Sequence, residues 1–563
     1  MKFLPGDRLG APNLTRLHVT RSLALAAALA SALLLPACTR VGGGTGSAGR
    51  HPWTIPGTLR IAISGSPKTL NPILSTTTFE SLAETFVFDP LVATDPEGRD
   101  VPVLAAVVPT LENGGISKDG RTIVYHLRHG VRWQDGAPFS SADVKFSFAA
   151  IMNPNTSAST RHGYDLVTRV DTPDAWTAVV HLKQPFAPAI HTFFAHSDAP
   201  FMILPAHLLA RYRSLDRVAF DEHPIGTGPF RFVRWSRGDR IVYAPNDAYF
   251  LGKPKLRRIE IHFVADESSI VNQLRTHEID WFFEPTALVY PDLKVIPGLS
   301  HSLVPFNGYD ALQINTAHPP FDDARVRRAI GLALDKQELV NKLTFGTSLA
   351  ATEDLPSFMW AFDPQAGTNR RSLAAAGALL DAAGWPMGRD GLRHHGTSAL
   401  TMGLAYHTDS AVDRRRVVLV GAMLRDAGIA TDIKGYNVSF MFASAAQHGV
   451  LASGNFDAAI TSWFAGIDPD NSTQLLCNQF PPTGWNWSRY CNPKMDAAQR
   501  VALSHYDRPT RKRAYAEIES LLAHDAPFVY LDWPRQFEVA NDDLRGFRPN
   551  GIVENWNAYQ WSI

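Results

Sequence analysis

The sequence is short of cysteine and has no excess of either charge. Its 563 residues include three cysteines, 54 Lys and Arg together, and 54 Asp and Glu together, so the formal net charge is zero. No long run of like charge is present, and the chain therefore lacks the basic stretch that is typical of nucleic-acid binding. We expect no nucleic acid among its partners.

The sequence motifs of common catalytic sites are also missing. The chain contains no G-x-S-x-G, no H-E-x-x-H and no G-x-x-x-x-G-K-[ST]. Gly226 and Gly228 begin a G-x-G, but it lies between Pro224 and Pro229 and does not continue as a dinucleotide fingerprint. These absences favour binding over catalysis, so we expect a protein that is not an enzyme and needs no cofactor or metal.

The sequence near the N-terminus predicts an export signal. Residues 22–35 are an unbroken run of Leu, Ala and Ser, preceded by Arg16 and Arg21. Such a run is shorter than the roughly 20 apolar residues that span a bilayer, and it fits a signal peptide. Pro36, Ala37 and Cys38 follow the run, which predicts a lipoprotein: residues 1–37 are removed and Cys38 carries the lipid. Secretion without a lipid is the alternative.

Residues 38–52 follow as a predicted tether, because a Gly- and Ser-rich segment cannot bury a core and behaves as a flexible coil. The remaining 510 or so residues exceed one compact core, so more than one domain is expected. No later segment is apolar enough to predict a membrane span. We expect an exported protein, in the periplasm or on the outer face of the cytoplasmic membrane, held there by its lipid.

Two cysteines remain if Cys38 is lipidated. Cys477 and Cys491 form an even pair in an oxidising compartment, and they enclose an irregular segment with two prolines. A disulfide closing a loop of about 15 residues stabilises a fold by roughly 3 kcal/mol in the loop-entropy model. We expect a disulfide here, with two free buried thiols as the alternative.

The two halves of the chain differ in their patterns. In the first half, residues 58–63, 121–132, 177–182 and 230–243 predict strands, and a helix follows the cap at residues 141–143. From about Asp310, helices alternate with strands, which indicates an α/β lobe.

Three helices are expected in this second half before a last long one. The first is capped by Asp322 and Asp323 and runs without a break to Gly346. The others begin at Ser372, Asp409 and Pro509, and the strands cover residues 400–406, 431–434 and 456–462.

Longer motifs resemble a known family. They are residues 96–154, Pro224–Phe230, Asn246–Tyr249, the segment FDDARVRRAIGLALDK from Phe321, Leu379–Trp385, and residues 456–471. In this order they are similar to the extracellular solute-binding proteins of family 5, the peptide and nickel class that serves ABC importers. The resemblance covers nearly everything after His51, and the cysteine pair resembles the cysteine-bounded loop of that family.

The resemblance implies an α/β, two-lobed, periplasmic-binding-protein-like fold of type II, of the large class with an inserted subdomain, closing on its ligand like a hinge. Lobe I would comprise residues 53–308 and 535–563, with the insertion at about 94–221. Lobe II would comprise residues 309–534.

The ligand-binding residues can be carried over only in part. Dipeptide-binding members hold the amino terminus of the peptide with an Asp, at the position where this chain has Gly466. They hold its carboxylate with an Arg, where this chain has His407 and Thr408. The residues expected to line the cleft are Thr76, His407, Thr408, Trp463, Phe464, Ala465, Gly466, Asp468 and Trp485. Asp468 would replace the missing Asp, or, alternatively, Asp468 and Pro469 cap a helix.

A cleft without both charged anchors should not favour free dipeptides, because an unpaired buried charge costs several kcal/mol. We expect it to bind longer peptides or a less charged solute between aromatic walls. The resulting hypothesis is a monomeric, lipid-anchored protein that delivers a peptide or peptide-like solute to ABC permease subunits. A sensor or chaperone with the same fold and an exported hydrolase are the alternatives.

Overall fold

The computed structural model describes residues 49–195, 201–367, 370–464 and 466–563. The chain divides into two units, Met1–Pro52 and Trp53–Ile563, and the second contains the helices and strands given below. The predicted signal segment and Cys38 lie outside the described residues. None of the described helices is both long and apolar enough to cross a membrane.

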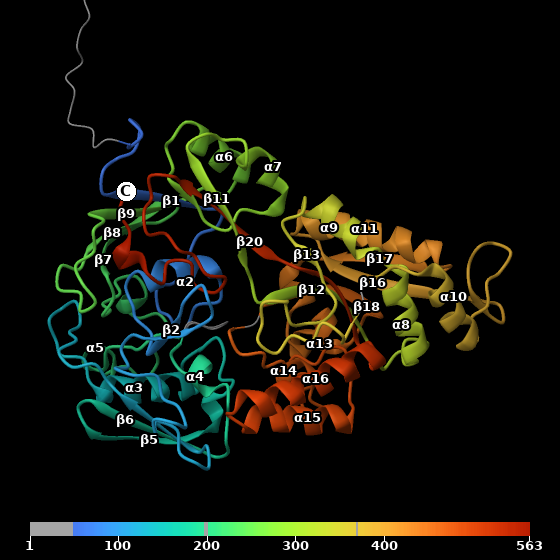
Figure 1. Cartoon of the computed structure of the whole chain (residues 1–563), viewed down its shortest axis with the longest axis horizontal. Helices are drawn as coiled ribbons and strands as arrows, with labels where there is room; N and C mark the ends of the chain where they lie inside the picture. Colours follow the sequence, from blue (N-terminus) through green and yellow to red (C-terminus); the bar gives the residue numbers. More distant parts are fainter. Residues whose placement is uncertain (1–48, 196–200, 368–369, 465) are drawn as a thin grey trace, which may run out of the picture. The chain divides into compact units, whose positions relative to one another are not determined.

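Two large sheets organise Trp53–Ile563, and we call the parts built around them lobe I and lobe II (Figure 1). The sheet of lobe I has the order β11-β20-β10-β1-β9-β8-β7. Its strands are β1 (Thr58–Ile63), β7 (Phe230–Ser236), β8 (Arg240–Pro245), β9 (Arg258–Phe263), β10 (Trp281–Phe282), β11 (Leu299–Pro305) and β20 (Arg535–Asn541). The predicted strand at residues 230–243 is thus a hairpin of two strands, β7 and β8, whose turn falls at residues 237–239.

The side chains of β1 show how the sheet of lobe I is buried on both faces. Leu59, Ile61 and Ile63 enter one hydrophobic cluster, whereas Ala62 enters another, as the alternation of a strand requires. Helices α6 (Glu267–Arg275) and α7 (Tyr290–Leu293) pack in the cluster of Ala62. Helix α2 (Thr78–Thr85) contributes Leu82 and Ala83 to the cluster on the other face.

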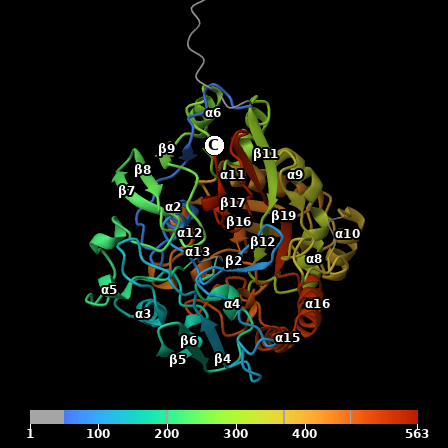
Figure 2. The ribbon, with the colours of Figure 1, turned by 60° about the vertical axis from the view of Figure 1, so that its left-hand side comes forward.

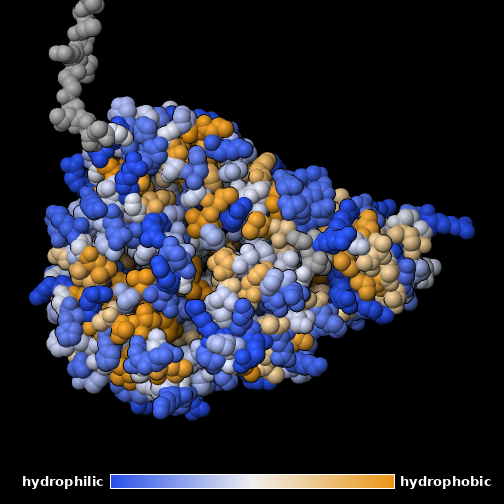
Figure 3. Space-filling model, viewed as in Figure 1, coloured by the Kyte–Doolittle hydropathy of each residue, from blue (hydrophilic) through white to orange (hydrophobic). Residues whose placement is uncertain are grey.

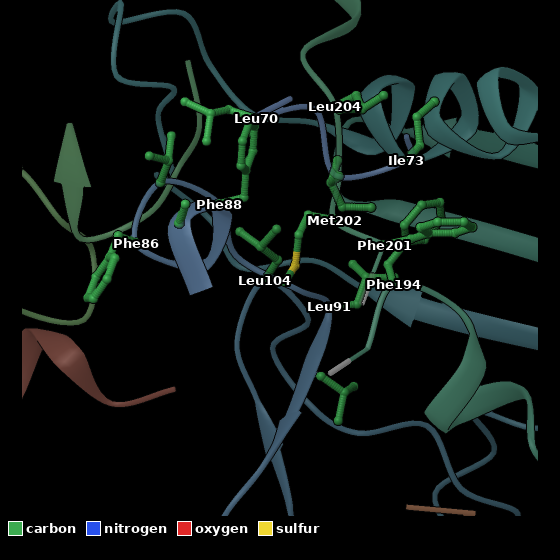
Figure 4. Close-up of a cluster of buried hydrophobic side chains, with 14 of the residues drawn as sticks. Leu70, Ile73, Phe86, Phe88, Leu91, Leu104, Phe194, Phe201, Met202 and Leu204 are labelled. Atoms are coloured by element: carbon green, nitrogen blue, oxygen red, sulfur yellow. The ribbon is translucent and has the colours of Figure 1, made fainter. Parts of the chain in front are cut away.

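An inserted segment shares this second cluster. Its elements are β2 (Val92–Thr94), β3 (Asp100–Pro102), β4 (Thr122–His126), α3 (Ser141–Met152), β5 (Val167–Asp174), β6 (Thr177–Leu182), α4 (Ala189–Thr192) and α5 (Ala206–Leu209). Figure 4 shows Phe86 and Phe88 beside α2 and Leu104, Phe201 and Met202 of the insertion in one continuous core. The insertion is therefore packed onto lobe I rather than tethered to it.

Lobe II contains a six-stranded sheet of order β13-β19-β12-β18-β16-β17. Its strands are β12 (Gly308–Ile314), β13 (Leu349–Ala350), β16 (Thr401–His407), β17 (Ala430–Tyr436), β18 (Ala458–Phe464) and β19 (Phe528–Trp533), and β14 (His394–His395) and β15 (Ser398–Ala399) form a separate hairpin. Its helices are α8 (Ala324–Ala333), α9 (Lys336–Leu343), α10 (Leu373–Ala382), α11 (Ala411–Asp426), α12 (Val438–Met441), α13 (Val450–Ser453), α14 (Ser472–Leu475), α15 (Pro493–Ser504) and α16 (Arg508–Asp525).

The prediction of one unbroken helix from the cap at Asp322 and Asp323 to Gly346 is wrong. The structure divides it into α8 and α9, because Asp335 lies in extended backbone and its side chain accepts a hydrogen bond from the backbone N–H of Glu338. Asp335 is therefore the N-cap of a second helix rather than a residue inside one.

The chain passes between the lobes twice in strand-like segments. It leaves lobe I after β11 and enters lobe II at β12, and it returns from β19 to β20 with Pro534 alone between the two strands. β20 then pairs antiparallel with β10 and β11. After β20 the chain stays with lobe I, where the ring of Trp561 contacts Trp281 and Phe86. The two-lobed fold that the resemblance implies is confirmed.

The α15–α16 hairpin of lobe II lies alongside the insertion in Figures 1 and 2. The backbone N–H of Ala187 donates to the carbonyl of Leu503 at 2.7 Å, and the hydroxyl of Tyr506 donates to the carbonyl of Phe186 at 2.9 Å. In the irregular segment before α15, Cys477 and Cys491 form a disulfide with a sequence separation of 14.

Candidate functional site

A cavity of about 790 Å³ lies between the two lobes. Lobe I contributes the segment before and in α2, the residues after β10 and part of the C-terminal segment, while lobe II contributes the ends of β12, α11 and β18. Pro534 and the first residues of β20 also line it, so the cavity reaches the point where the chain crosses between lobes. Pockets that bind small molecules usually measure about 300–1,000 Å³.

Aromatic side chains form part of the lobe II wall. β18 ends at Trp463 and Phe464, where both side chains reach the cavity. The ring of Trp463 lies 5.2 Å from that of Trp485, and Phe464 lies 5.0 Å from Phe306, both in edge-to-face arrangements. Phe464 is 55% and Trp485 41% exposed, so these rings offer apolar surface that a solute can cover. The face of the molecule shown in Figure 3 carries hydrophobic side chains in patches among hydrophilic ones.

A buried cation, Arg416 of α11, lies on the same side of the cavity. Its guanidinium donates to Asp310 Oδ2 at 2.5 Å, to Asp413 Oδ1 at 2.6 Å and to Asp532 Oδ1 at 3.1 Å. Burial lowers the pKa of Arg416, but the three carboxylates more than offset this and raise it above its usual range. The charge of Arg416 is therefore neutralised by lobe II itself, and it is not a free anchor for a solute carboxylate.

Asp468 also lines the cavity, and its carboxylate is fully engaged. Arg511 of α16 binds it with two parallel hydrogen bonds of 2.7 and 2.6 Å. Burial raises the pKa of Asp468, but Arg511 and His191 outweigh burial and hold it well below its usual range. The N-cap of the nearby helix α14 is Asn471, so Asp468 is the partner of Arg511 rather than a helix cap.

Two histidines of the insertion reach aspartates of lobe II. His191 Nδ1 lies 3.7 Å from Asp468 Oδ2, while its Nε2 lies 2.8 Å from Asp100 Oδ1. His162 Nε2 lies 3.2 Å from Asp470 Oδ2. Burial lowers the pKa of His191, but the two carboxylates raise it, to about 9. These ion pairs join the insertion to lobe II beside the cavity.

The structure brings most of the predicted site residues together. Those that line the one cavity are Thr76, Trp463, Phe464, Gly466, Asp468 and Trp485. His407 and Thr408 do not: His407 Nε2 lies 3.0 Å from Asp413 Oδ2, and the Thr408 hydroxyl donates to the carbonyl of Tyr436. Ala465 lies outside the described residues.

Sequence patterns did not predict the charged residues of the cavity other than Asp468. On lobe II these include Arg416, whose only local signal is its i, i+3 spacing from Asp413. On lobe I they include Arg535 of β20 and the glutamates Glu284 and Glu554, which lie far apart in the sequence. Within the described part of Trp53–Ile563, no three His, Cys, Asp or Glu side chains bring their ligand atoms close enough together to hold a metal ion.

Comparisons with known proteins agree with this architecture. A sequence profile of the bacterial extracellular solute-binding proteins, family 5, middle region, matches residues 90–483. Protein XP55 of Streptomyces lividans is 28% identical over 476 residues, covering 84% of this chain and 82% of that protein. The oligopeptide-binding protein AppA of Bacillus subtilis is 24% identical over 519 residues, covering 90% and 91%.

The solved structure of AppA from Bacillus subtilis, in complex with a nonapeptide, has the same fold. It matches with a TM-score of 0.74 and 22% identity, covering 90% of this chain and 98% of that one.

Proposed function

The chain belongs to the bacterial extracellular solute-binding proteins of family 5, and we propose that it captures a peptide or peptide-like solute for an ABC importer. The observation that carries this proposal is the cavity of about 790 Å³ between two lobes that the chain joins by strand-like crossings. A solute bound there contacts both lobes, so it stabilises the closed arrangement over an open one. The closed form is what a permease would recognise.

The residues that line the cavity indicate the class of solute. Trp463, Phe464 and Trp485 offer apolar surface, and Arg416 and Asp468 already have partners within lobe II. The positions that hold the two charged ends of a dipeptide carry Gly466 and the His407–Thr408 pair. Peptides longer than two residues fit these walls better, because backbone hydrogen bonds and apolar contacts hold them along their length. The name of the relative AppA, an oligopeptide-binding protein, supports the same class.

Calorimetry with alanine peptides of two to nine residues tests the solute class. We expect dialanine to bind weakly or not at all and longer peptides to bind more tightly. Micromolar binding of dialanine to the wild type would contradict the proposed preference, and its loss in an Asp468→Asn variant that is still folded would show that the missing charge had moved to Asp468.

We propose further that residues 1–37 are a signal peptide and that Cys38 carries the lipid anchor at the outer face of the cytoplasmic membrane. The support is the apolar run at residues 22–35, which ends just before this cysteine. The variant Cys38→Ser should leave the membrane fraction and appear in the soluble fraction, with Cys477→Ser as the matched control that stays with the membrane. Wild-type protein that carries no diacylglycerol would contradict the anchor.

A further inference from the structure

Three glutamates from separate segments of lobe I gather at the cavity. Glu284 follows β10, Glu538 lies in β20 and Glu554 lies in the C-terminal segment. Glu284 is half-buried, Glu538 and Glu554 are buried, and Glu284 and Glu554 line the cavity. Arg416 of lobe II lines the same cavity.

The contacts of the three carboxylates are all with neutral donors. The side-chain amide of Gln536 donates to Glu284 Oε1 at 3.0 Å and also to Glu554 Oε1. The hydroxyl of Thr78 donates to Glu284 Oε2, and the indole N–H of Trp281 donates to Glu538 Oε2 at 2.7 Å. Among the described residues, no Lys, Arg or His forms an ion pair with any of the three.

The other carboxylates that line the cavity form ion pairs with cationic side chains of the protein. All four belong to lobe II, and each has a cationic partner in the protein: Asp310 and Asp413 pair with Arg416, Asp468 with Arg511, and Asp470 with His162. Within the described part of the cavity wall, Glu284 and Glu554 are therefore the acidic groups whose charge the protein leaves uncompensated.

Buried acceptor atoms without a hydrogen-bond partner lie beside Glu284 and Glu554. Glu538 is 1% exposed, and neither its Oε1 nor the Oε1 of Gln536 has a hydrogen-bond partner among the described residues. Gln536 and Glu538 are two residues apart in β20, so their side chains lie on the same face of the strand. That face points toward Glu284 and Glu554, which Gln536 contacts. A buried acceptor without a donor is costly, and a cationic ligand would supply the donors.

Burial and the neighbouring carboxyl groups determine the pKa values of the three glutamates. Burial raises the pKa of Glu284 to about 7. Burial, together with the charge of Glu284, raises the pKa of Glu538 to about 8 and that of Glu554 well above its usual range. A cation held between the carboxylates would lower all three pKa values and ionise the group.

The geometry favours an organic cation over a metal ion. The oxygens of the three carboxylates do not all lie within 4.8 Å of one another, so one small ion cannot be coordinated by all three. An alkylammonium or a guanidinium group carries several N–H donors that point in different directions, and it can reach separated acceptors.

We propose that Glu284 and Glu554, backed by Glu538, form a subsite for a cationic group of the bound solute, an alkylammonium or a guanidinium. In a peptide this is the amino terminus or a basic side chain. The proposal rests on the proposed function only for the statement that the cation belongs to a peptide; the subsite itself is defined by lobe I.

The test uses calorimetry with two probes. Arginine amide carries both cationic groups and no carboxylate, whereas N-acetyl-pentaalanine carries no cation. We expect arginine amide to bind the wild-type protein and to lose roughly 10- to 100-fold in affinity in Glu284→Gln and in Glu554→Gln, the range for charge-assisted hydrogen bonds. Glu353→Gln is the matched control, because Glu353 is a buried carboxylate of raised pKa that does not line this cavity. It should bind arginine amide as the wild type does.

The outcomes separate this proposal from the proposed function. Melting temperatures of the two Gln variants close to that of the wild type show that they fold, since glutamine replaces each carboxyl with a neutral group of the same shape. If the peptide binds but arginine amide does not, or binds the Gln variants equally, the cation subsite is wrong and the proposed function stands. If arginine amide binds through Glu284 and Glu554 but no peptide does, the subsite stands and the peptide assignment is wrong.

Discussion

Removing the indole of Trp485 should weaken solute binding without disturbing the fold. Trp485 lies in the irregular segment enclosed by the disulfide, and it lines the cavity with its ring against Trp463. It remains 41% exposed, so a large part of its surface is available to a bound solute. The variant Trp485→Ala therefore separates the contribution of this wall to binding from its contribution to stability.

The size of the effect follows from the area that a solute can cover. A tryptophan side chain can bury up to about 250 Å². The exposed 41% of Trp485 is then roughly 100 Å², and at about 25 cal/mol per Å² its complete coverage is worth about 2.5 kcal/mol. A solute that covers less than half of this area gains about 1 kcal/mol. We expect Trp485→Ala to lower the affinity roughly 5- to 70-fold.

Trp176 provides a matched control. It is 43% exposed, it stacks on His129 in the insertion, and it does not line the cavity. Calorimetry with pentaalanine should give a lower affinity for Trp485→Ala and an unchanged affinity for Trp176→Ala, with similar melting temperatures for both. Equal affinities of the two variants would refute the assignment of Trp485 to the binding wall.

Three further predictions concern stability. Asp468→Asn leaves Arg511 as a buried cation without its partner and should lower the free energy of unfolding by about 3–5 kcal/mol in urea titrations without ligand. His191 has a folded pKa raised to about 9, so its charged form stabilises the protein fully below the unfolded pKa of about 6.5, and this contribution is lost as the pH rises through 9. The melting temperature of His191→Gln should therefore fall furthest below wild type near pH 6 and approach it at pH 10. Replacing Cys477 and Cys491 with Ala should lower the free energy of unfolding by about 3 kcal/mol under non-reducing conditions.

Each of these predictions has its own control. Restored stability in Asp468→Asn combined with Arg511→Met would tie the loss to the unpaired cation, whereas a loss below 1 kcal/mol in Asp468→Asn alone would contradict the buried pair. Equal melting temperatures of His191→Gln and the wild type near pH 6 would contradict the ion pairs of His191 with Asp100 and Asp468. A variant without Cys477 and Cys491 that is as stable as the wild type would show that the segment between these residues keeps its structure without the disulfide.

Local patterns predicted the elements whose signals lie within a few residues. The helix α10 was expected between Ser372 and Gly384, and the structure has it at Leu373–Ala382 with Ser372 as its cap. The break between α8 and α9 was missed because Asp335 interrupts an otherwise helical spacing of apolar residues, and its role as a cap depends on its extended backbone. β12 and β19 were missed because both are buried along their whole length, so no alternation marks them.

The residues of the cavity likewise include some that local sequence predicts and others that only the fold brings together. Trp463 and Phe464 could be predicted, because they end a recognisable strand within a long motif. Glu284 and Glu554 could not, because their proximity depends on the return of the chain through β20, which places segments about 270 residues apart at one wall. His407 was predicted to line the cleft from its position before α11, but its side chain turns toward Asp413 instead.

The most direct test of the account is native mass spectrometry of the protein purified from its own host without denaturation. We expect a bound species that leaves when the protein is unfolded, that fragments into amino-acid residue masses, and that carries at least one amino or guanidinium group. A bound species without peptide bonds, in a protein that also fails to bind alanine peptides by calorimetry, would contradict the assignment of a peptide to the cavity between the lobes.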